Sequence, residues 1–265
     1  MTPIVGPHEA PIAAATVVVS LAVASVYLFV GYRLSERVVS PAARLASVQL
    51  ALWWGGLGAT VVLGAVETAF ALGNSLPLAL ALTLTIVDDI VIVVALWGLV
   101  GFLTYVYTGK YHLPEWGATY GMFFVLAIYY TLAQTPYAVA FSGGAVTILY
   151  SVAPIRWLEA VIIVILVGPE LVGAILYLSL LRRTRVQEQR ARIWLVGGGI
   201  LLWFALDIFV PGSSGGWLLV RSLLEIVPGL MSLIAFYPPA WAQRRFGLTN
   251  SLRRSERMPE ASTDL

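Results

Sequence analysis

The sequence has no cysteine, only one lysine and only two histidines among its 265 residues. Without cysteine there is no disulfide, no thiolate nucleophile and no cysteine-based metal site. The histidines, His8 and His112, are predicted to lie on opposite sides of a membrane, so they cannot share a metal ion. Charged residues are also scarce, at 11% of the chain against about 25% in soluble proteins. These shortages exclude an ordinary soluble domain.

Apolar residues are abundant: 59% of the chain is hydrophobic and its mean hydropathy is +0.87. A membrane-spanning helix needs about 20 mostly apolar residues. The N-terminus has no basic residue and no small-residue cleavage site, so the first helix is predicted to be retained rather than removed as a signal. We predict an all-α, multi-pass protein of the cell membrane, with a seven-helix transmembrane bundle over residues 1–241. Its spans are 11–33, 46–72, 77–108, 115–140, 155–181, 192–210 and 216–238.

Basic residues are distributed unequally between the two sides of this bundle. Loops on the cytoplasmic side of a membrane carry an excess of Lys and Arg. Only Arg156 and Arg221 lie in or near the opposite half of the spans. We therefore predict an outside N-terminus, a cytoplasmic C-terminus and a disordered basic tail over 242–265 that touches lipid. The basic residues of the predicted cytoplasmic side are Arg33, Arg37, Arg44, Lys110, Arg182, Arg183, Arg185, Arg190, Arg192, Arg244, Arg245, Arg253, Arg254 and Arg257.

The second and sixth spans carry similar residues in a similar order. Trp53 and Trp194 lie near their starts, glycines follow, and Glu67 and Asp207 lie near their ends. This pattern favours a parallel 3+1+3 repeat. The architecture alone resembles the broad group of heptahelical sugar carriers, microbial rhodopsins and related receptors. A retinal Schiff base needs a lysine in the seventh span, and the single lysine is Lys110, so we predict no retinal and no other cofactor.

Several ionisable and polar residues fall inside the apolar spans. A charge at the bilayer centre costs at least about 2.5–3.5 kcal/mol, so such side chains are expected to face the bundle interior or water. Most of the acids lie toward the outer ends, which predicts an acidic cavity that opens outward. Asp88 and Asp89 are about 100° apart on a helix, so only one of them faces the cavity. The candidate ligand- or ion-binding residues are Glu67, Asp88, Asp89, Glu170, Asp207, Arg221, Glu225, Gln134 and Tyr130.

Two spans place a proline–glycine defect beside an acid. Gly168 and Pro169 precede Glu170 in the fifth span, and Pro228 and Gly229 follow Glu225 in the seventh. A proline removes one helical hydrogen bond and leaves a carbonyl free four residues earlier. A carboxylate next to a free carbonyl suits a proton, Na⁺ or an amine. We expect Gly168, Pro169, Pro228 and Gly229 to act as hinges.

These features favour a proton- or cation-coupled carrier of a small solute. The alternative is a heptahelical ligand sensor that signals through a separate partner at its cytoplasmic loops or in the membrane. A metal-dependent enzyme acting on a lipid or isoprenoid is favoured less, because the spans hold no HExxH, GxGD, histidine or cysteine. The expected partners are the bilayer and a small solute or cation. Topology explains the basic residues, so no nucleic-acid role is predicted.

Overall fold

The structure is a computed structural model that describes residues 4–36, 41–110, 112–142, 145–151, 156–209 and 215–248. Some residues in these ranges are described by their backbone alone. They are residues 41–43, 113–114, 127, 129–133, 142, 156–163, 165–166, 207–209 and 215–218.

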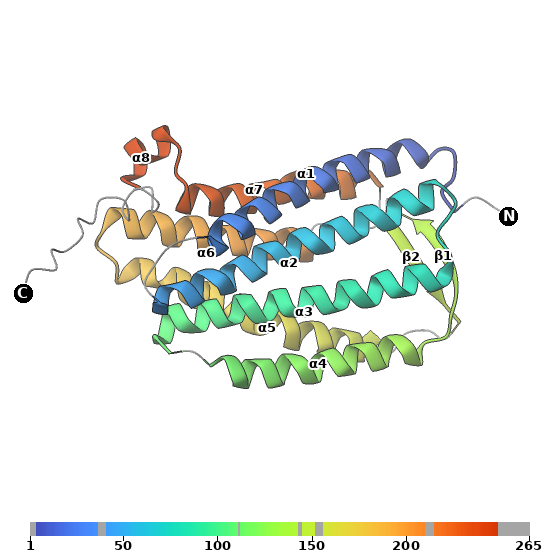
Figure 1. Cartoon of the computed structure of the whole chain (residues 1–265), viewed down its shortest axis with the longest axis horizontal. Helices are drawn as coiled ribbons and strands as arrows, with labels where there is room; N and C mark the ends of the chain where they lie inside the picture. Colours follow the sequence, from blue (N-terminus) through green and yellow to red (C-terminus); the bar gives the residue numbers. More distant parts are fainter. Residues whose placement is uncertain are drawn as a thin grey trace, which may run out of the picture.

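The described chain is mostly helical, and its long helices lie side by side along the long axis of the molecule (Figure 1). Among the described residues, four segments are long and apolar enough to cross a membrane, judged by length and composition: Ala10–Ser35, Arg44–Leu72, Leu78–Thr108 and Leu219–Phe236. The protein therefore has the character of a helical membrane protein. The helices are α1 (Ala10–Ser35), α2 (Pro41–Leu72), α3 (Leu78–Thr108), α4 (Leu113–Ala133), α5 (Arg156–Ser179), α6 (Gln187–Phe209), α7 (Gly215–Phe236) and α8 (Ala240–Phe246).

Six of these helices pack as a closed ring, in the order α1, α2, α3, α5, α6, α7 and back to α1. Helix α4 packs mainly against α3, outside the ring. Glycines allow close approach between neighbours, as is common where helices pack in membranes. A Cβ atom on Gly31 of α1 would lie 2.8 Å from the backbone nitrogen of Gly55 in α2. A Cβ atom on Gly56 would lie 2.5 Å from the Cβ atom of Ala95 in α3.

Aromatic side chains fill part of the interior enclosed by the six helices. Trp53 of α2 is completely buried, and its ring centroid lies 5.0 Å from that of Trp203 and 6.0 Å from that of Phe204, both in α6. Trp54 faces α1 instead, where its ring lies 5.1 Å from that of Tyr27. Helices α2 and α6 therefore meet across the ring through aromatic side chains.

A β-hairpin connects α4 to α5, where the sequence predicted a helix up to residue 140. Helix α4 ends at Ala133, and β1 (Pro136–Ser142) pairs antiparallel with β2 (Ala145–Tyr150). The predicted span 115–140 is therefore wrong beyond Ala133. Proline disfavours continuation of a helix, and the residues after it are β-branched or aromatic at many positions, which favours strands. The hairpin packs against α2 and α3 at the end of the bundle where α1 begins (Figure 1).

Helix α8 lies at the opposite end of the bundle (Figure 1). It occupies the first residues of the segment 242–265 that the sequence predicted to be a disordered tail. Pro239 precedes its first turn, and Gly247 ends it with a φ of 65°, a conformation that glycine adopts without strain. Residues 249–265 lie outside the described residues. The two ends of the bundle are called the hairpin end and the α8 end below.

Candidate functional site

Glu170 is the most deeply buried acid of the described chain. It lies in α5 directly after Pro169, and the helix continues through this proline to Ser179. Its side chain is 0% exposed. Neither carboxyl oxygen has a hydrogen-bond partner among the described residues. An isolated charge costs several kcal/mol to bury, so this carboxyl group needs a proton or a cation beside it.

The buried face of α5 shows where Glu170 points. Ala174 and Tyr177 follow it at helical spacing and are also buried. On the same side, Gly173 lies so close to α3 that its Cβ atom would be 3.0 Å from the side chain of Leu103. The ring of Tyr177 lies 5.8 Å from that of Phe102. Glu170 is therefore on the face of α5 that packs toward α3 and the interior of the ring.

Two more buried polar groups lie near the same height in the bundle. Gln49 of α2 has no partner for either amide atom, and Trp53, one turn further along, has none for its ring nitrogen, among the described residues. A Cβ atom on Gly98 would lie 2.7 Å from the carbonyl oxygen of Gln49. On α3, Gly98 marks the height of Gln49, and Leu103 marks the height of Gly173. Glu170 comes three residues before Gly173, so its height is only about 3 Å from that of Gln49, at 1.5 Å per residue. Buried polar groups are normally satisfied, so this layer is chemically unusual.

Asp88 and Glu67 form a separate acidic region toward the hairpin end. Asp88 shares a stripe of α3 with Ala95, which packs on α2, and it is close enough to Glu67 of α2 to interact with it electrostatically. One oxygen of Asp88 is buried without a partner among the described residues. Asp89 lies on the neighbouring face, with Leu96 and Leu103. Asp88 is therefore the member of the pair that faces α2.

This acidic region and Glu170 are far apart along the bundle. Asp88 lies about twelve residues before the level of Glu170 on α3, which corresponds to about 18 Å along the axis. The structure therefore does not bring Glu170 and Asp88 into one cluster. Within the described residues no group of three or more His, Cys, Asp and Glu side chains could hold a metal ion.

The segment of α7 from Arg221 to Gly229, called the α7 kink below because it contains the helix-interrupting Pro228, holds a formed ion pair. The guanidinium Nε of Arg221 donates to a carboxyl oxygen of Glu225 at 2.8 Å, and both side chains are mostly buried. The sequence spacing of four residues predicts this pair, because such residues are neighbours on a helix. Both side chains make further interactions, so neither of them is a free charge.

The same kink is held from two sides by other helices. The hydroxyl group of Tyr27 in α1 donates to the backbone carbonyl of Glu225, and the ring of Tyr27 lies against Gly229, whose Cβ atom would be 2.8 Å from it. On the other side, a Cβ atom on Gly199 of α6 would lie 3.1 Å from the carbonyl oxygen of Pro228. Tyr27 was missed by the sequence analysis, since it is 198 residues from its partner and no local pattern identifies it.

The remaining predicted residues lie outside the two regions described above or outside the described side chains. Gln134 is buried, but it caps the end of α4 and begins the connection to β1, so it does not lie within a helix. The side chains of Tyr130 and Asp207 lie outside the described part of the structure. Gly168 has open space around it, because a Cβ atom there would meet nothing within 4 Å.

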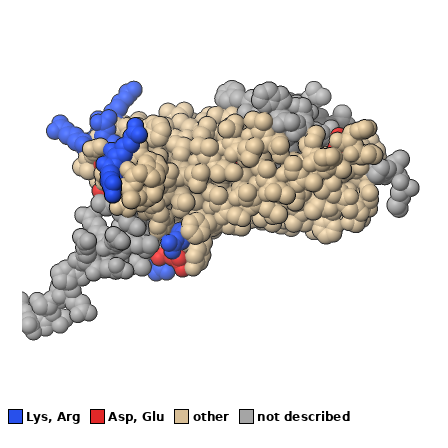
Figure 2. Space-filling view, turned by 90° about the horizontal axis from the view of Figure 1, so that it is seen from above, with Lys and Arg blue, Asp and Glu red and all other residues tan. Residues whose placement is uncertain are grey.

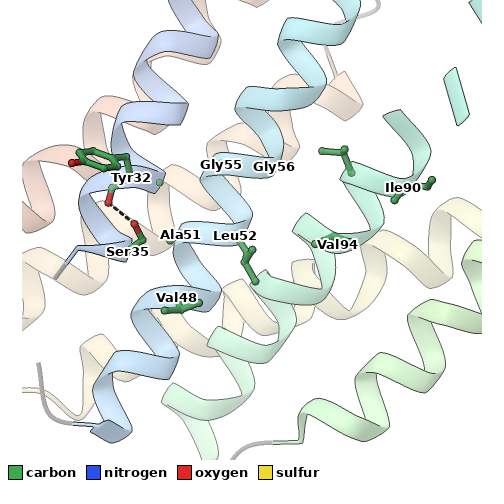
Figure 3. A pocket seen from close by; sticks show the side chains of 11 residues that line it. Tyr32, Ser35, Val48, Ala51, Leu52, Gly55, Gly56, Ile90 and Val94 are labelled. Atoms are coloured by element: carbon green, nitrogen blue, oxygen red, sulfur yellow. Dashed lines mark hydrogen bonds between the residues drawn. The ribbon is translucent and has the colours of Figure 1, made fainter. Parts of the chain in front are cut away.

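Two grooves are lined entirely by described residues, and neither contains a predicted acid. The first has a volume of about 390 Å³ and lies between α1, α2 and α3. Figure 3 shows Gly55 and Gly56 of α2 between Tyr32 of α1 and Ile90 of α3. Its lining has no charged side chain, so it is an apolar surface feature. The second groove lies at the α8 end.

The fold and composition together define a mostly helical protein with several helices able to cross a membrane. No protein family matches the chain, and no curated protein or solved structure is significantly similar to it. Its function must therefore be inferred from its own residues and their geometry.

Proposed function

We propose that this chain is a proton- or cation-coupled carrier of a small solute, crossing the cell membrane seven times with its N-terminus outside. Helices α1 to α7 lie alongside one another, which supports seven spans (Figure 1). On the face seen in Figure 2, the Lys and Arg side chains gather at one end of the molecule, and the long surface between the ends shows almost no charge. This end is the α8 end, which supports a cytoplasmic C-terminus.

The observation that carries the proposal is the buried carboxyl group of Glu170, which has no hydrogen-bond partner among the described residues. A buried acid in this condition can take up and release a proton or a cation without breaking a contact with any of them. Gln49 and Trp53 offer an amide and a ring N–H near the same height. Intramembrane acids are rare because they are costly, and they commonly mark ion and proton pathways.

Asp88 and Glu67 have a different role in this proposal. They lie toward the hairpin end, which is the outer side in the proposed orientation, and would attract a cation to the outward-opening cavity that the sequence predicts. The ion then moves about 18 Å along the bundle to reach Glu170. The kink of α7 lies beside the ion pair of Arg221 and Glu225, where movement of α7 would change access.

Transport in liposomes tests this function. Purified protein is reconstituted with a pH-sensitive dye inside the vesicles, and a panel of cations and amines is added outside. The wild type should move protons or solute, whereas Glu170→Gln should reduce this flux to background, because the amide has nearly the same shape but cannot ionise. Glu225→Gln should weaken flux through loss of its ion pair with Arg221.

A matched control removes an acid outside the site. Glu115 begins α4 and its side chain is 69% exposed, so Glu115→Gln should leave flux unchanged. Thermal unfolding in detergent checks that each variant is folded. Full flux in folded Glu170→Gln would refute a coupling role for Glu170.

A ligand sensor is the second candidate, and the contacts of Tyr27 favour it. The hydroxyl group of Tyr27 links α1 to the kink of α7 beside the Arg221–Glu225 pair, so a ligand at this pair could move two helices together. In this case the liposomes show no flux with any cation or amine. Instead, a ligand raises the thermal unfolding midpoint of the wild type but not that of Glu225→Gln.

The parallel repeat stays a prediction. Trp53 and Trp194 correspond in the sequence comparison, but Trp53 is completely buried whereas Trp194 is 57% exposed. A Cβ atom on Gly56 would meet α3, while one on Gly197 would meet Tyr177 and Leu178 of α5. Equivalent positions in the two halves therefore have different surroundings.

A further inference from the structure

The second groove lies at the α8 end, between the start of α6, the connection that follows α5, and Phe246 of α8. Its volume is about 530 Å³. It has a polar part, formed by Arg185, Gln187 and Arg190, and an apolar part, formed mainly by Trp194, Leu195 and Phe246. Both parts belong to one continuous hollow. We call it the α6 groove.

The two arginines of the α6 groove have no carboxylate partner among the described residues. The nearest acid in the sequence is Glu188, which pairs with Arg192 at 2.8 Å, one turn further along α6. Arg185 and Arg190 are both exposed. They therefore present positive charge that is free to bind an anion from outside the protein.

The apolar part of the groove is open at Trp194, while Leu195 is buried. Trp194 is 57% exposed, and it lies one turn beyond Arg190, deeper along α6 from the α8 end. Trp241 of α8 is 55% exposed at the same end of the molecule. Tryptophan is enriched where lipid headgroups meet the acyl chains, because its ring is apolar and its N–H is polar. In the proposed orientation, these rings would lie at the membrane–water boundary.

We propose that the α6 groove binds an anionic phospholipid, with the headgroup phosphate between Arg185 and Arg190 and the beginning of an acyl chain against Trp194. The order of the two parts along α6 matches the order of headgroup and chain in a lipid. Guanidinium groups recognise phosphate through paired hydrogen bonds. The cytoplasmic leaflet, where the proposed orientation places this groove, is rich in anionic lipids. The proposal does not depend on transport activity.

A free phosphate or soluble anion would satisfy the arginines but not the apolar part. Leu195 and Phe246 next to the charged residues provide a surface for hydrocarbon, which a soluble anion does not use. The exposed ring of Trp194 extends this surface along α6 toward the membrane interior. This continuity of charge and apolar surface is why we assign the groove to a lipid.

Lipid-dependent stabilisation of the full chain tests the assignment. Protein purified in a neutral detergent is titrated with phosphatidylglycerol, with phosphatidylcholine or with inorganic phosphate, and its thermal unfolding midpoint is followed. Phosphatidylglycerol should raise the midpoint, whereas the other two should not. Native mass spectrometry should show phosphatidylglycerol retained on the protein.

The variant Arg185→Gln/Arg190→Gln should bind phosphatidylglycerol about twenty-five-fold more weakly, from about fivefold for each arginine near an anionic headgroup. A matched control, Arg182→Gln/Arg183→Gln, removes the same charge from exposed residues nearby that do not line the groove. This control should keep the wild-type affinity. The variant Trp194→Ala should also weaken phosphatidylglycerol without creating affinity for phosphate.

Three results would overturn the proposal. Equal losses in the two double variants would mean that general charge attraction, and not the groove, retains the lipid. Equal stabilisation by inorganic phosphate would assign the arginines to a soluble anion. Absence of any difference between phosphatidylglycerol and phosphatidylcholine in the wild type would mean that there is no anionic-lipid site.

Discussion

At the scale of single residues, some buried polar groups have a hydrogen-bond or ion-pair partner, and others have none within the described part of the chain. The hydroxyl group of Tyr27 and the ion pair of Arg221 and Glu225 belong to the first kind. Glu170 and Gln49 belong to the second. A buried polar group without a partner costs about 1–3 kcal/mol, so the second kind reduces stability. This cost is consistent with residues retained for a function.

Replacement of Tyr27 by phenylalanine tests how much a buried polar group with a partner stabilises the protein. Tyr27→Phe removes the hydrogen bond to the Glu225 carbonyl and leaves that buried carbonyl with one partner fewer, so it should cost about 1–2 kcal/mol. The thermal unfolding midpoint in detergent should fall measurably. Tyr32→Phe is the control: its hydroxyl bonds to exposed Glu36, and its loss should have almost no effect. Equal shifts in the two variants would show that the Tyr27 bond does not stabilise the kink.

At the scale of helices, contacts between small residues determine how the ring closes. Gly31 of α1 lies against the backbone of α2, and Gly56 of α2 lies against Ala95 of α3. Gly64 of α2 has no neighbour within 4 Å of the position that a Cβ atom would occupy. Glycine therefore has a packing role at the first two positions, but no such role at the third.

An alanine substitution at each kind of position should have opposite effects. Gly31→Ala places a methyl group 2.8 Å from a backbone nitrogen and should destabilise the protein by about 1–3 kcal/mol through overpacking. The methyl group added by Gly64→Ala meets no atom within 4 Å. This substitution should stabilise the protein by about 0.5–1 kcal/mol, because alanine favours the helix. Thermal unfolding of both variants in the same detergent measures the difference. A stabilising Gly31→Ala would contradict the close contact of α1 and α2.

At the scale of the whole molecule, the distribution of charge and the two distinct ends define a direction. The hairpin packs against α2 and α3 at one end, and α8 and the exposed arginines lie at the other (Figures 1 and 2). A membrane potential and the insertion machinery both respond to such asymmetry. The proposed orientation follows from it.

Labelling of single cysteines in intact cells tests this orientation. The natural chain has no cysteine, so an introduced one is the only thiol. Thr147→Cys on the exposed side of β2 should react with a membrane-impermeant maleimide added outside. Gln189→Cys, exposed in the first turn of α6, should react only after the cells are lysed. The reverse pattern would invert the topology, and labelling of both in intact cells would contradict the seven spans.

The sequence by itself determined that the chain is built from long apolar helices, and it placed most of them within a few residues of their positions in the structure. It also predicted the pairing of Arg221 with Glu225. These features depend on local patterns, since apolar runs and four-residue spacing are read along one segment. The hairpin was missed because the residues after Pro136 continue the apolar run of the helix before it. Pro136, the Gly143-Gly144 pair and the β-branched residues are the sequence signals that distinguish it from a span.

The tertiary structure decided which residues meet. It separated Glu170 from Asp88, directed Asp88 toward α2, and joined Tyr27 to the kink of α7. It also placed Gln49 and Trp53 near the height of Glu170, and it formed the α6 groove from three segments. Such contacts depend on the relative rotation and height of helices far apart in the chain. Helix packing fixes both quantities, and no single segment encodes them.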